Sequence, residues 1–558
     1  MRRIYFYGLA SLLGVAACDQ VLGIEDARPG WTISTGTTGT GATGTGATGT
    51  GGSTGGGGSG GCTPGVTMAC YSGPAGTKDV GICQAGTMTC RPDGSGFGDC
   101  AGEVTPQAET CASTSDEDCS GHDCAQWAGL FDATGSVATI GLAVDQDGNV
   151  VLVGQLSGSI SLPNGSIDSV GTIDAFVLKL DAEGKPLWGK AFGGVDNLTI
   201  GAGVAVDGAG DVVVSGKTMA AISIGGAPVG PGLFVTKLSK SSGQPTWSRS
   251  FTVNHVDPSQ FELDDVLPLA ATPEGDVVLG GTFTSDIDFG NGVIAGPAGG
   301  TGWYGFVARL NGSDGSGEWG RALCSGTSRC GVDGVGVDSK GNLLLAAEFN
   351  GTFNISPTSP ALASVGITDA VLAKLAPNGD PFWQRRFGAA GAYVDVKSLS
   401  VDVSDGPGIA GSFEGPIDFG TGSVPAPPGA TAFVAQYASD KTHVWSRVFD
   451  APAGGVTGRA AGSFVAGTFT VPFSFGAGTS SISPSGGSDV FIARFSESGA
   501  VVWSRGYGDT GNQWIDALAF TRQGDPIVVG MTESAIDLGT GLLKPTNGQA
   551  IFAAKLSP

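Results

Sequence analysis

Apolar and polar positions alternate along most of the chain in short runs that predict β-strands. A representative run, Leu142 to Asp145, ends in aspartate, turns through Gln146 to Asn149 and continues as the apolar run Val150 to Gly154. Because glycine and asparagine accept the positive φ of tight turns, this pattern predicts a two-stranded hairpin. The pattern recurs at Val206-Asp207, Glu274-Gly275-Asp276, Val337-Asp338 and Gly524-Asp525.

After each hairpin and a variable loop, the sequence predicts a third strand and then a fourth strand that carries a tryptophan. The third strand has the pattern of Asp174 to Leu180, and it recurs at Phe234 to Leu238, Phe306 to Leu310, Asp369 to Leu375, Phe433 to Tyr437, Asp489 to Phe495 and Phe552 to Leu556. Seven tryptophans mark the fourth strands, at Trp127, Trp188, Trp247, Trp319, Trp383, Trp445 and Trp503. A unit repeated in this way buries its apolar faces against its neighbours.

Seven units of four strands predict an all-β fold, a seven-bladed β-propeller over residues 125–558. The chain ends directly after a third strand, whereas the strand of Trp127 precedes the first hairpin. Pairing Trp127 to Phe131 with the last unit would close the ring and remove an exposed sheet edge. The sixth unit departs most, since Gly462 to Val465 lacks the hairpin dipeptide, and we expect its first strands to be short.

These residues resemble the bacterial seven-bladed β-propeller repeat family, called SBBP-like. Its units share the Val-Asp, Gly-Asn and Asp-Ala-Phe-Val-Ala-Lys-Leu signatures, and the resemblance covers Trp127 to Leu556. It implies the fold and says little about function, because propellers host many unrelated activities.

The start of the chain predicts export and a lipid anchor. A basic start and the apolar run Ile4 to Ala17 indicate a signal peptide over residues 1–17, too short to span a membrane. The segment Val15 to Cys18 resembles the lipobox of bacterial lipoproteins, which implies acylation of Cys18. Residues 18–61 are rich in Gly, Thr, Ala and Ser and predict a disordered, flexible tether. We expect a protein anchored in the bacterial envelope, at the outer membrane or cell surface rather than the inner membrane.

Residues 62–124 form a small cysteine-rich module. An even number of cysteines after an export signal predicts disulfides, here among Cys62, Cys70, Cys83, Cys90, Cys100, Cys111, Cys119 and Cys124. The sequence does not choose among the possible pairings. In the repeat region, Cys324 and Cys330 predict one further local disulfide.

The end of this module is similar to the tail of metal-binding motifs of the MopE type, at Glu109 to Cys111 and Asp116 to Gly121. The resemblance implies a Ca²⁺ site with oxygens from Asp116, Asp118 and Asp123, because calcium prefers carboxylate and carbonyl ligands. The family's longer upstream Asp-Gly-Asp run is missing. The sequence favours an acidic turn held by disulfides, with no cofactor, and the Ca²⁺ site is the alternative.

Charge and histidine content exclude several function classes. The chain has 51 acidic and 28 basic residues and a net charge of −23, which disfavours nucleic acid as a partner and favours solubility. The histidines, His122, His255 and His443, lie in different modules or repeats, without a zinc motif or a credible serine nucleophile. Catalysis by paired carboxylates stays open.

We expect the repeated tryptophans to pack between blades, so the candidates for a binding surface lie outside the repeat positions. They are Trp303, Tyr304 and Trp514 beside loops, and His255, Asp264 and Asp265 in the long insertion Thr252 to Val266. Asp333 and Asp516 occupy equivalent positions, four residues before the end of a first strand. Two such positions among seven units do not make a metal-binding ring.

The sequence favours a non-catalytic, lipid-anchored surface protein, a monomer whose propeller binds a protein or a glycan. The first alternative is a carbohydrate-active hydrolase or lyase. Carboxylates beside Trp303 or Trp514 would favour this alternative, and a closed or apolar centre would count against it. The second alternative is a calcium-binding surface protein, in which the cysteine-rich module binds the metal and the propeller displays it.

Overall fold

The computed structural model describes residues 61–557 apart from 75, 108–114, 120–123, 226–227, 252–266, 298–301, 327, 426–428, 450–455, 462 and 477. Every regular element in these described residues is a β-strand. Among the same residues there is no helix long and apolar enough to cross a membrane. The signal-like segment, Cys18, Cys111 and the tether lie outside the described residues.

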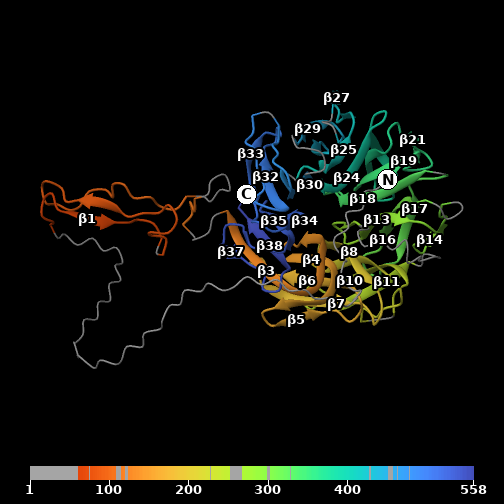
Figure 1. The fold of residues 1–558 in the computed structure, drawn as a ribbon, viewed down its shortest axis with the longest axis horizontal. Helices are drawn as coiled ribbons and strands as arrows, with labels where there is room; N and C mark the ends of the chain where they lie inside the picture. Colours follow the sequence, from red (N-terminus) through yellow and green to blue (C-terminus); the bar gives the residue numbers. More distant parts are fainter. Residues whose placement is uncertain are drawn as a thin grey trace, which may run out of the picture. The chain divides into compact units, whose positions relative to one another are not determined.

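Five separate sheets each contain four antiparallel strands (Figure 1). Their strands are β8 (Thr199–Val206), β9 (Val212–Thr218), β10 (Gly232–Leu238) and β11 (Pro245–Phe251); β12 (Leu269–Ala271), β13 (Val277–Phe283), β16 (Tyr304–Leu310) and β17 (Gly317–Ala322); β18 (Arg329–Val337), β19 (Leu343–Asn350), β22 (Asp369–Leu375) and β23 (Pro381–Phe387); β24 (Tyr393–Val401), β25 (Pro407–Glu414), β28 (Thr431–Tyr437) and β29 (His443–Val448); and β30 (Val456–Ala461), β31 (Phe464–Phe469), β32 (Asp489–Phe495) and β33 (Val501–Tyr507). Within each sheet, spatial order follows chain order.

A sixth sheet joins the two ends of the repeat region. Its strands are β34 (Gln513–Phe520), β35 (Pro526–Thr532), β38 (Ala550–Leu556), β3 (Ala125–Val144), β4 (Val150–Leu162), β6 (Asp174–Leu180) and β7 (Pro186–Phe192), with β5 (Gly165–Asp168) beside β4. The long strand β3 has two partners. Its first part pairs with β38, Trp127 opposite Lys555, and its second part pairs with β4. The predicted pairing of the Trp127 strand with the last strand of the chain is therefore present.

Small two-stranded sheets complete the architecture. They are β1 (Thr67–Cys70) with β2 (Gly86–Thr89), β14 (Ile287–Asp288) with β15 (Val293–Ile294), β20 (Thr352–Phe353) with β21 (Leu362–Ala363), β26 (Ile417–Asp418) with β27 (Ser423–Val424), and β36 (Ile536–Asp537) with β37 (Leu542–Leu543). Except for β1 and β2, they lie in the loop between the second and third strand of a repeat.

The third strands carry the core. The strands β6, β22 and β28 are buried along their whole length, as near-continuous apolar runs covered on both faces require. The third strands β6, β10, β16 and β22 each pack in one apolar cluster with the first and second strands of the next sheet. At roughly 25 cal/mol per Å² of apolar surface removed from water, this shared burial is what stabilises one sheet against the next.

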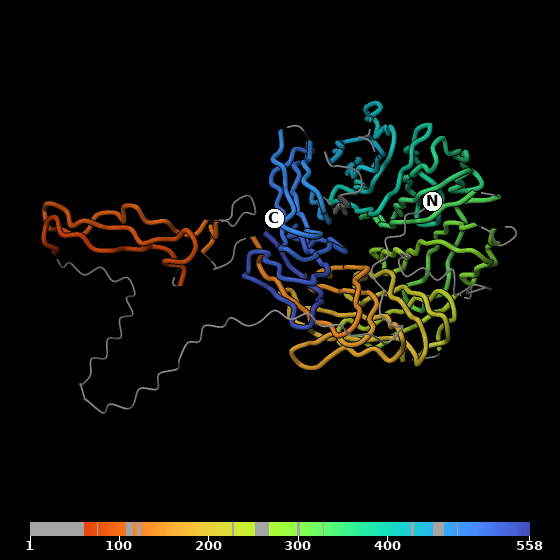
Figure 2. The backbone as a smooth tube through the Cα atoms, in the orientation of Figure 1, coloured from red at the N-terminus to blue at the C-terminus, as the bar shows by residue number. Residues whose placement is uncertain are grey.

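The first strands of successive sheets contact one another in chain order: β3 with β8, β8 with β12, β12 with β18, β18 with β24, β24 with β30, β30 with β34, and β34 with β3 (Figure 2). All seven predicted third strands are present. In the sixth unit, β30 and β31 are six residues each, so this unit keeps both strands despite its missing hairpin dipeptide. The prediction of an all-β protein with many small antiparallel sheets is confirmed.

The cysteine-rich module is held by disulfides, as predicted. The bonds are Cys62–Cys90, Cys70–Cys100 and Cys83–Cys119, and in the repeat region Cys324–Cys330. Cys124 is also disulfide-bonded. Each bond of the module closes a loop of about thirty residues, which in the chain-entropy account stabilises by about 3–4 kcal/mol.

Candidate functional site

The aspartates that end the first strands are structural. Asp145 accepts hydrogen bonds from the backbone N–H groups of its own hairpin and forms an ion pair of 2.9 Å with Lys179 on β6. Both side chains are almost fully buried. Comparable pairs join Asp207 to Lys237 and Asp338 to Lys374. In two other sheets the aspartate lies just before the second strand, and the pairs are Asp276 with Arg309 and Asp525 with Lys555. These carboxylates are committed to holding hairpins to third strands and are poor candidates for chemistry.

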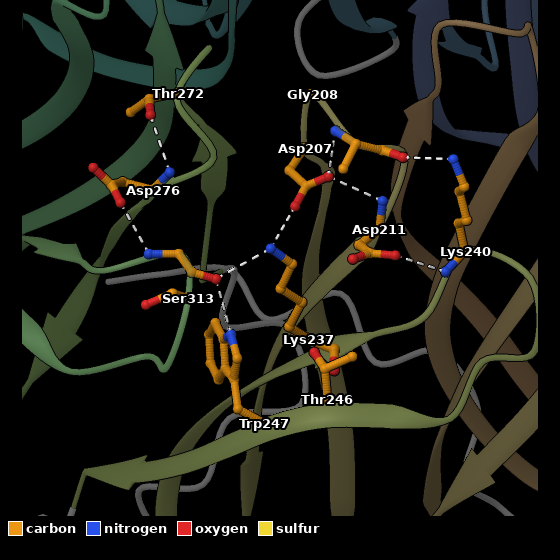
Figure 3. A network of polar contacts seen from close by, with 12 residues as sticks. Asp207, Gly208, Asp211, Lys237, Lys240, Thr246, Trp247, Thr272, Asp276 and Ser313 are labelled. Atoms are coloured by element: carbon orange, nitrogen blue, oxygen red, sulfur yellow. Dashed lines mark hydrogen bonds and ion pairs between the residues drawn. The ribbon is translucent and has the colours of Figure 1, made fainter.

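The repeated tryptophans are structural too, and Figure 3 shows one of them. The indole Nε1 of Trp247 donates to the carbonyl oxygen of Gly312 in the next sheet at 3.0 Å, and Lys237 Nζ donates to the same oxygen at 3.1 Å. Equivalent bonds join Trp127 to Ala182, Trp188 to Lys240, Trp319 to Pro377 and Trp383 to Ser439. Trp445 stacks on Phe495 instead. These indoles fasten one sheet to the next, as the sequence predicted.

The aromatic residues outside the repeat pattern are only partly accessible. Tyr304, the first residue of β16, is 6% exposed, and its hydroxyl donates to Gly326 O at 2.6 Å. Trp303 is half-buried; its carbonyl oxygen accepts from Cys330 N at 3.0 Å, and the guanidinium of Arg329 lies 6.0 Å from its ring centre. Trp514, on β34, is partly buried against the apolar core.

Several other predicted site residues are not brought together in the described part. His255, Asp264, Asp265 and Asp123 lie outside the described residues. The backbone carbonyl of Asp116 accepts from Ile82 N at 3.1 Å within the cysteine-rich module, and Asp118 lies just before Cys119. Among the described residues no group of three His, Cys, Asp or Glu side chains could hold a metal ion. The calcium site stays a prediction.

A recurring β-bulge displaces one residue in five of the first strands. The bulges fall between Thr139 and Gly141, Gly201 and Gly203, Val332 and Gly334, Val396 and Ser398, and Ile515 and Ala517. A bulge leaves its extra residue unpaired and re-aims the side chain, which is why bulges recur beside active sites. Three of the five displaced residues are charged: Asp333, Lys397 and Asp516.

Lys397 is the centre of a charged cluster on β18, β19 and β24. Its Nζ forms an ion pair of 2.8 Å with Asp395, and its side chain is 56% exposed while that of Asp395 is 14% exposed. Burial acts to lower the pKa of Lys397, but the ion pair with Asp395 and the charges of Asp333 and Glu348 outweigh it and raise this pKa above its ordinary value. Lys397 is therefore a cation paired with Asp395, and the charges of Asp333 on β18 and Glu348 on β19 act on it as well.

A second polar contact lies where β3 meets β34. Thr139 Oγ1 donates a short hydrogen bond to Asp516 Oδ2. This bond joins β3, at the beginning of the repeat region, to β34, the first strand of the last unit. Asp516 is two residues from Trp514, and Asp333 follows Arg329, the residue beside Trp303, on one strand. Asp516 thus lies on the same strand as Trp514, and Asp333 lies on the strand whose Arg329 contacts Trp303.

The sequence analysis noticed Asp333 and Asp516 but missed Lys397, Asp395 and Glu348. The sequence could have indicated Lys397 by its position, because it stands four residues before the end of its first strand, as Asp333 and Asp516 do. A separate cavity of about 320 Å³ contains no carboxylate and is lined by Arg321, Ala322, Asn354, Ser356, Pro357 and Ser359. We therefore take the cluster around Lys397 as the candidate site.

Comparisons with known proteins give structural likeness only. No protein-family model and no curated protein matches the chain. Propeller-like solved structures that resemble it include a gluconolactonase from Xanthomonas campestris (11% identity, 77% of this chain and 99% of that chain, TM-score 0.26). Others are an exotype rhamnogalacturonan lyase (11%, 75% and 74%, TM-score 0.25) and a rhamnogalacturonan lyase from Bacillus licheniformis (10%, 76% and 91%, TM-score 0.24).

These comparisons correct the expected function. The prediction of a non-catalytic binding or scaffold protein, and of no enzyme activity, is contradicted because the similar structures are enzymes. Their activities are those of the other proteins, and identities and TM-scores this low carry no argument about what this chain acts on. Any enzymatic function must be argued from the residues of this chain.

Proposed function

We propose that this protein is a carbohydrate-active hydrolase whose catalytic centre is the cluster of Asp333, Glu348 and Asp395 around Lys397. The single observation that carries the proposal is this grouping of three carboxylates with one lysine, on first and second strands of neighbouring sheets. Glycoside hydrolysis needs a carboxylic acid to protonate the leaving oxygen and a carboxylate to act as base or nucleophile.

The proposal includes a closed ring of seven blades with the cluster at its centre. It is supported by the order of contacts among the first strands and by the pairing of β3 with both β38 and β4. In such a ring, the first strands surround the axis, and the bulges at Asp333, Lys397 and Asp516 direct charged side chains toward it. A polar centre of this kind suits a hydrophilic substrate.

The charges favour hydrolysis over elimination. An elimination needs a base that removes a carbon-bound proton, and the raised pKa of Lys397 keeps this side chain protonated and unable to act as that base. Carboxylates outnumber the lysine, so the cluster repels acidic sugars and favours a neutral glycan. Lys397 would hold Asp395 in place through their ion pair.

The location of this activity follows from the start of the chain. Acylation of Cys18 and a tether over residues 18–61 would hold the enzyme at the bacterial envelope while letting it reach polysaccharide outside the membrane. The cysteine-rich module would then stand between anchor and enzyme. Radiolabelled palmitate incorporated by the wild-type chain and absent from Cys18→Ser is the result we expect.

The test is a screen of the purified protein for release of reducing ends from neutral polysaccharides. We expect Asp333→Asn, Glu348→Gln or Asp395→Asn to lower the rate by about 100-fold or more in at least two cases, as removal of a general acid or base does. Asp288→Asn, in the β14–β15 hairpin, is the matched control and should keep the wild-type rate. Wild-type rates in all three variants would contradict the site, and unsaturated products would indicate a lyase.

A further inference from the structure

The sheet of β30 to β33 contains a buried carboxyl group whose hydrogen bonding is incomplete. Asp489, the first residue of β32, is 1% exposed. Its Oδ2 accepts a short hydrogen bond from Ser485 N. Its Oδ1 is buried and has no hydrogen-bond partner among the described residues. A buried carboxylate oxygen without a donor costs on the order of 1–3 kcal/mol or more, so this oxygen needs an explanation.

Sister repeats satisfy the same oxygen. Asp174 begins β6, and its Oδ1 accepts from Gly171 N at 3.2 Å. Asp369 begins β22, and its Oδ1 accepts from Gly366 N at 2.9 Å. Asp369 has a cation as well, because its Oδ2 lies 3.0 Å from Arg386 Nη1.

The repeat of Asp489 has lost both kinds of partner. Arg386 stands opposite Val371, two residues after Asp369, whereas the residue opposite Phe491, two residues after Asp489, is Gly506. The repeat also has Asp509 just after the glycine that follows its fourth strand. Where the repeat of Asp369 has the cation of Arg386, the repeat of Asp489 has Gly506, which has no side chain. The repeat of Asp489 also has one more acidic residue nearby, Asp509.

A second oxygen lies close to the unpartnered one. A Cβ atom on Gly508 would lie 2.4 Å from Asp489 Oδ1 and 2.4 Å from Gln513 Oε1, so the two oxygens cannot be farther apart than twice that distance. The amide group of Gln513 is fixed with its oxygen on this side, because its Nε2 donates to Asp509 Oδ1 at 3.1 Å and to Ser534 Oγ at 2.6 Å. Gln513 Oε1 accepts a long hydrogen bond from Asp509 N at 3.4 Å. Two acceptor oxygens that face each other in a buried site repel unless one of them carries a hydrogen.

The surrounding charges decide which group carries that hydrogen. Burial acts to raise the pKa of Asp509, but hydrogen bonds from Ser534, Gly511 and Gln513 outweigh it and hold this pKa below its ordinary value. Burial is the largest influence on Asp489, and together with the charge of Asp509 it outweighs the hydrogen bonds from Ser485 and raises the pKa of Asp489. Segment 485–488 has no ionisable side chain, and Glu533, on the segment after β35, accepts from Asn512 Nδ2 at 2.9 Å.

We propose that the Asp489 carboxyl group is protonated in the folded protein and donates a hydrogen bond from Oδ1 to Gln513 Oε1. This bond joins the first residue of β32 to the first residue of β34, and Gln513 N also donates to Ser488 O at 2.6 Å. Loss of the proton would leave two oxygens facing each other and would push apart the segment that leads to Trp514. The pair is therefore a proton-dependent contact between the starts of β32 and β34, and this inference does not depend on the proposed activity.

The first experiment compares Asp489→Asn with Asp174→Asn in the whole protein. Asparagine mimics a protonated carboxyl group, because its amide N–H can donate to Gln513 Oε1 as the proposed O–H does. We expect the Tm of Asp489→Asn at pH 8 to equal or exceed that of the wild type. Asp174→Asn should lower Tm by a few degrees, about 2–4 °C, because its new N–H group faces Gly171 N–H or Val170 N–H. An equal loss of Tm in both variants would overturn the proposal.

The second measurement follows the Asp489 carboxyl group directly by its ¹³C chemical shift as a function of pH, with Asp489→Asn to assign the signal. We expect titration well above the range of an exposed aspartate. The sign for stability follows: a carboxyl whose pKa is raised by folding stabilises at low pH, and this contribution is lost as pH rises through the folded-state value. Titration of Asp489 near the ordinary value for aspartate would contradict protonation. Added Na⁺ or Ca²⁺ that raises the Tm of the wild type but not of Asp489→Asn would contradict it too, and would indicate a bound cation.

Discussion

The indole Nε1 of Trp127 donates to the carbonyl oxygen of Ala182 at 2.8 Å, although Trp127 lies on the part of β3 that pairs with β38 and Ala182 lies in the turn after β6. The same bond recurs at Trp188, Trp247, Trp319 and Trp383 but not at Trp503. This tryptophan is 6% exposed, and its Nε1 has no hydrogen-bond partner among the described residues. The turn that would supply the carbonyl oxygen does not exist, because β38 and β3 are joined by pairing and not by a connecting turn.

Replacing each of these two indoles by phenylalanine should therefore have different costs. Trp127→Phe loses ring contacts and the hydrogen bond to Ala182, whereas Trp503→Phe loses ring contacts and removes a buried donor that has no partner. We expect Trp127→Phe to be less stable than Trp503→Phe by about 1 kcal/mol, the net worth of one such bond. Urea unfolding followed by circular dichroism measures both, and a larger loss for Trp503→Phe would contradict the account.

The ion pair of Asp338 and Lys374 predicts a strongly non-additive pair of substitutions. The two groups lie 2.8 Å apart, and both side chains are buried. Lys374→Met leaves a buried carboxylate without its cation and should cost about 3–5 kcal/mol. The double variant Asp338→Asn, Lys374→Met removes that charge and should be more stable than Lys374→Met alone. If the double variant is the less stable one in a denaturation series, the ion pair is not the reason for the loss.

Acid should destabilise the protein partly through these same aspartates. Burial acts to raise the pKa of Asp338, but hydrogen bonds from Lys374 and Asn342 outweigh it and hold this pKa below 3.8, and the pKa of Asp145 is lowered in the same way by Asn149 and Lys179. A depressed pKa stabilises the fold above the unfolded-state value, and this contribution is lost as pH falls below about 4. Unfolding free energies measured down to about pH 2 should fall less steeply in the double variant than in the wild type.

Two adjacent glycines should respond differently to alanine. A Cβ atom on Gly193 would lie 1.7 Å from Asp174 Oδ1, whereas one on Gly194 would make only ordinary contacts, at 3.7 Å from Ile222. Because Asp174 is fixed by Val170 N and Gly171 N, it cannot move aside without losing bonds in a buried site. We expect Gly193→Ala to cost about 1–3 kcal/mol and Gly194→Ala to stay near the wild type in thermal unfolding. Equal stability of the two variants would show that Asp174 yields easily.

The strands were predictable from the sequence, but the candidate site was predictable only in part. Runs of mostly apolar residues bounded by Gly-containing turns located Asp174 to Leu180 and its six counterparts. Because these strands are buried on both faces, their apolar residues form a continuous run that is visible in the local sequence. The cluster around Lys397 depends on which strands become neighbours and on a bulge that re-aims one side chain, and neither is encoded locally. Tyr304 was expected beside a loop as a binding residue, yet its ring is buried.

Strand β3 also imposes an order of events on the maturing chain. Ala125 pairs with Leu556, so the sheet begun by the earliest part of the repeat region cannot be completed until its last part has been synthesised. Contacts this distant in sequence form slowly, because closing a long loop has a high entropy cost. Until then β35 and the nascent segment of Trp127 have unpaired backbone groups, which invite pairing with a second copy. A partly synthesised chain is thus the aggregation-prone species of this protein, and the pairing of β38 with β3 ends that exposure.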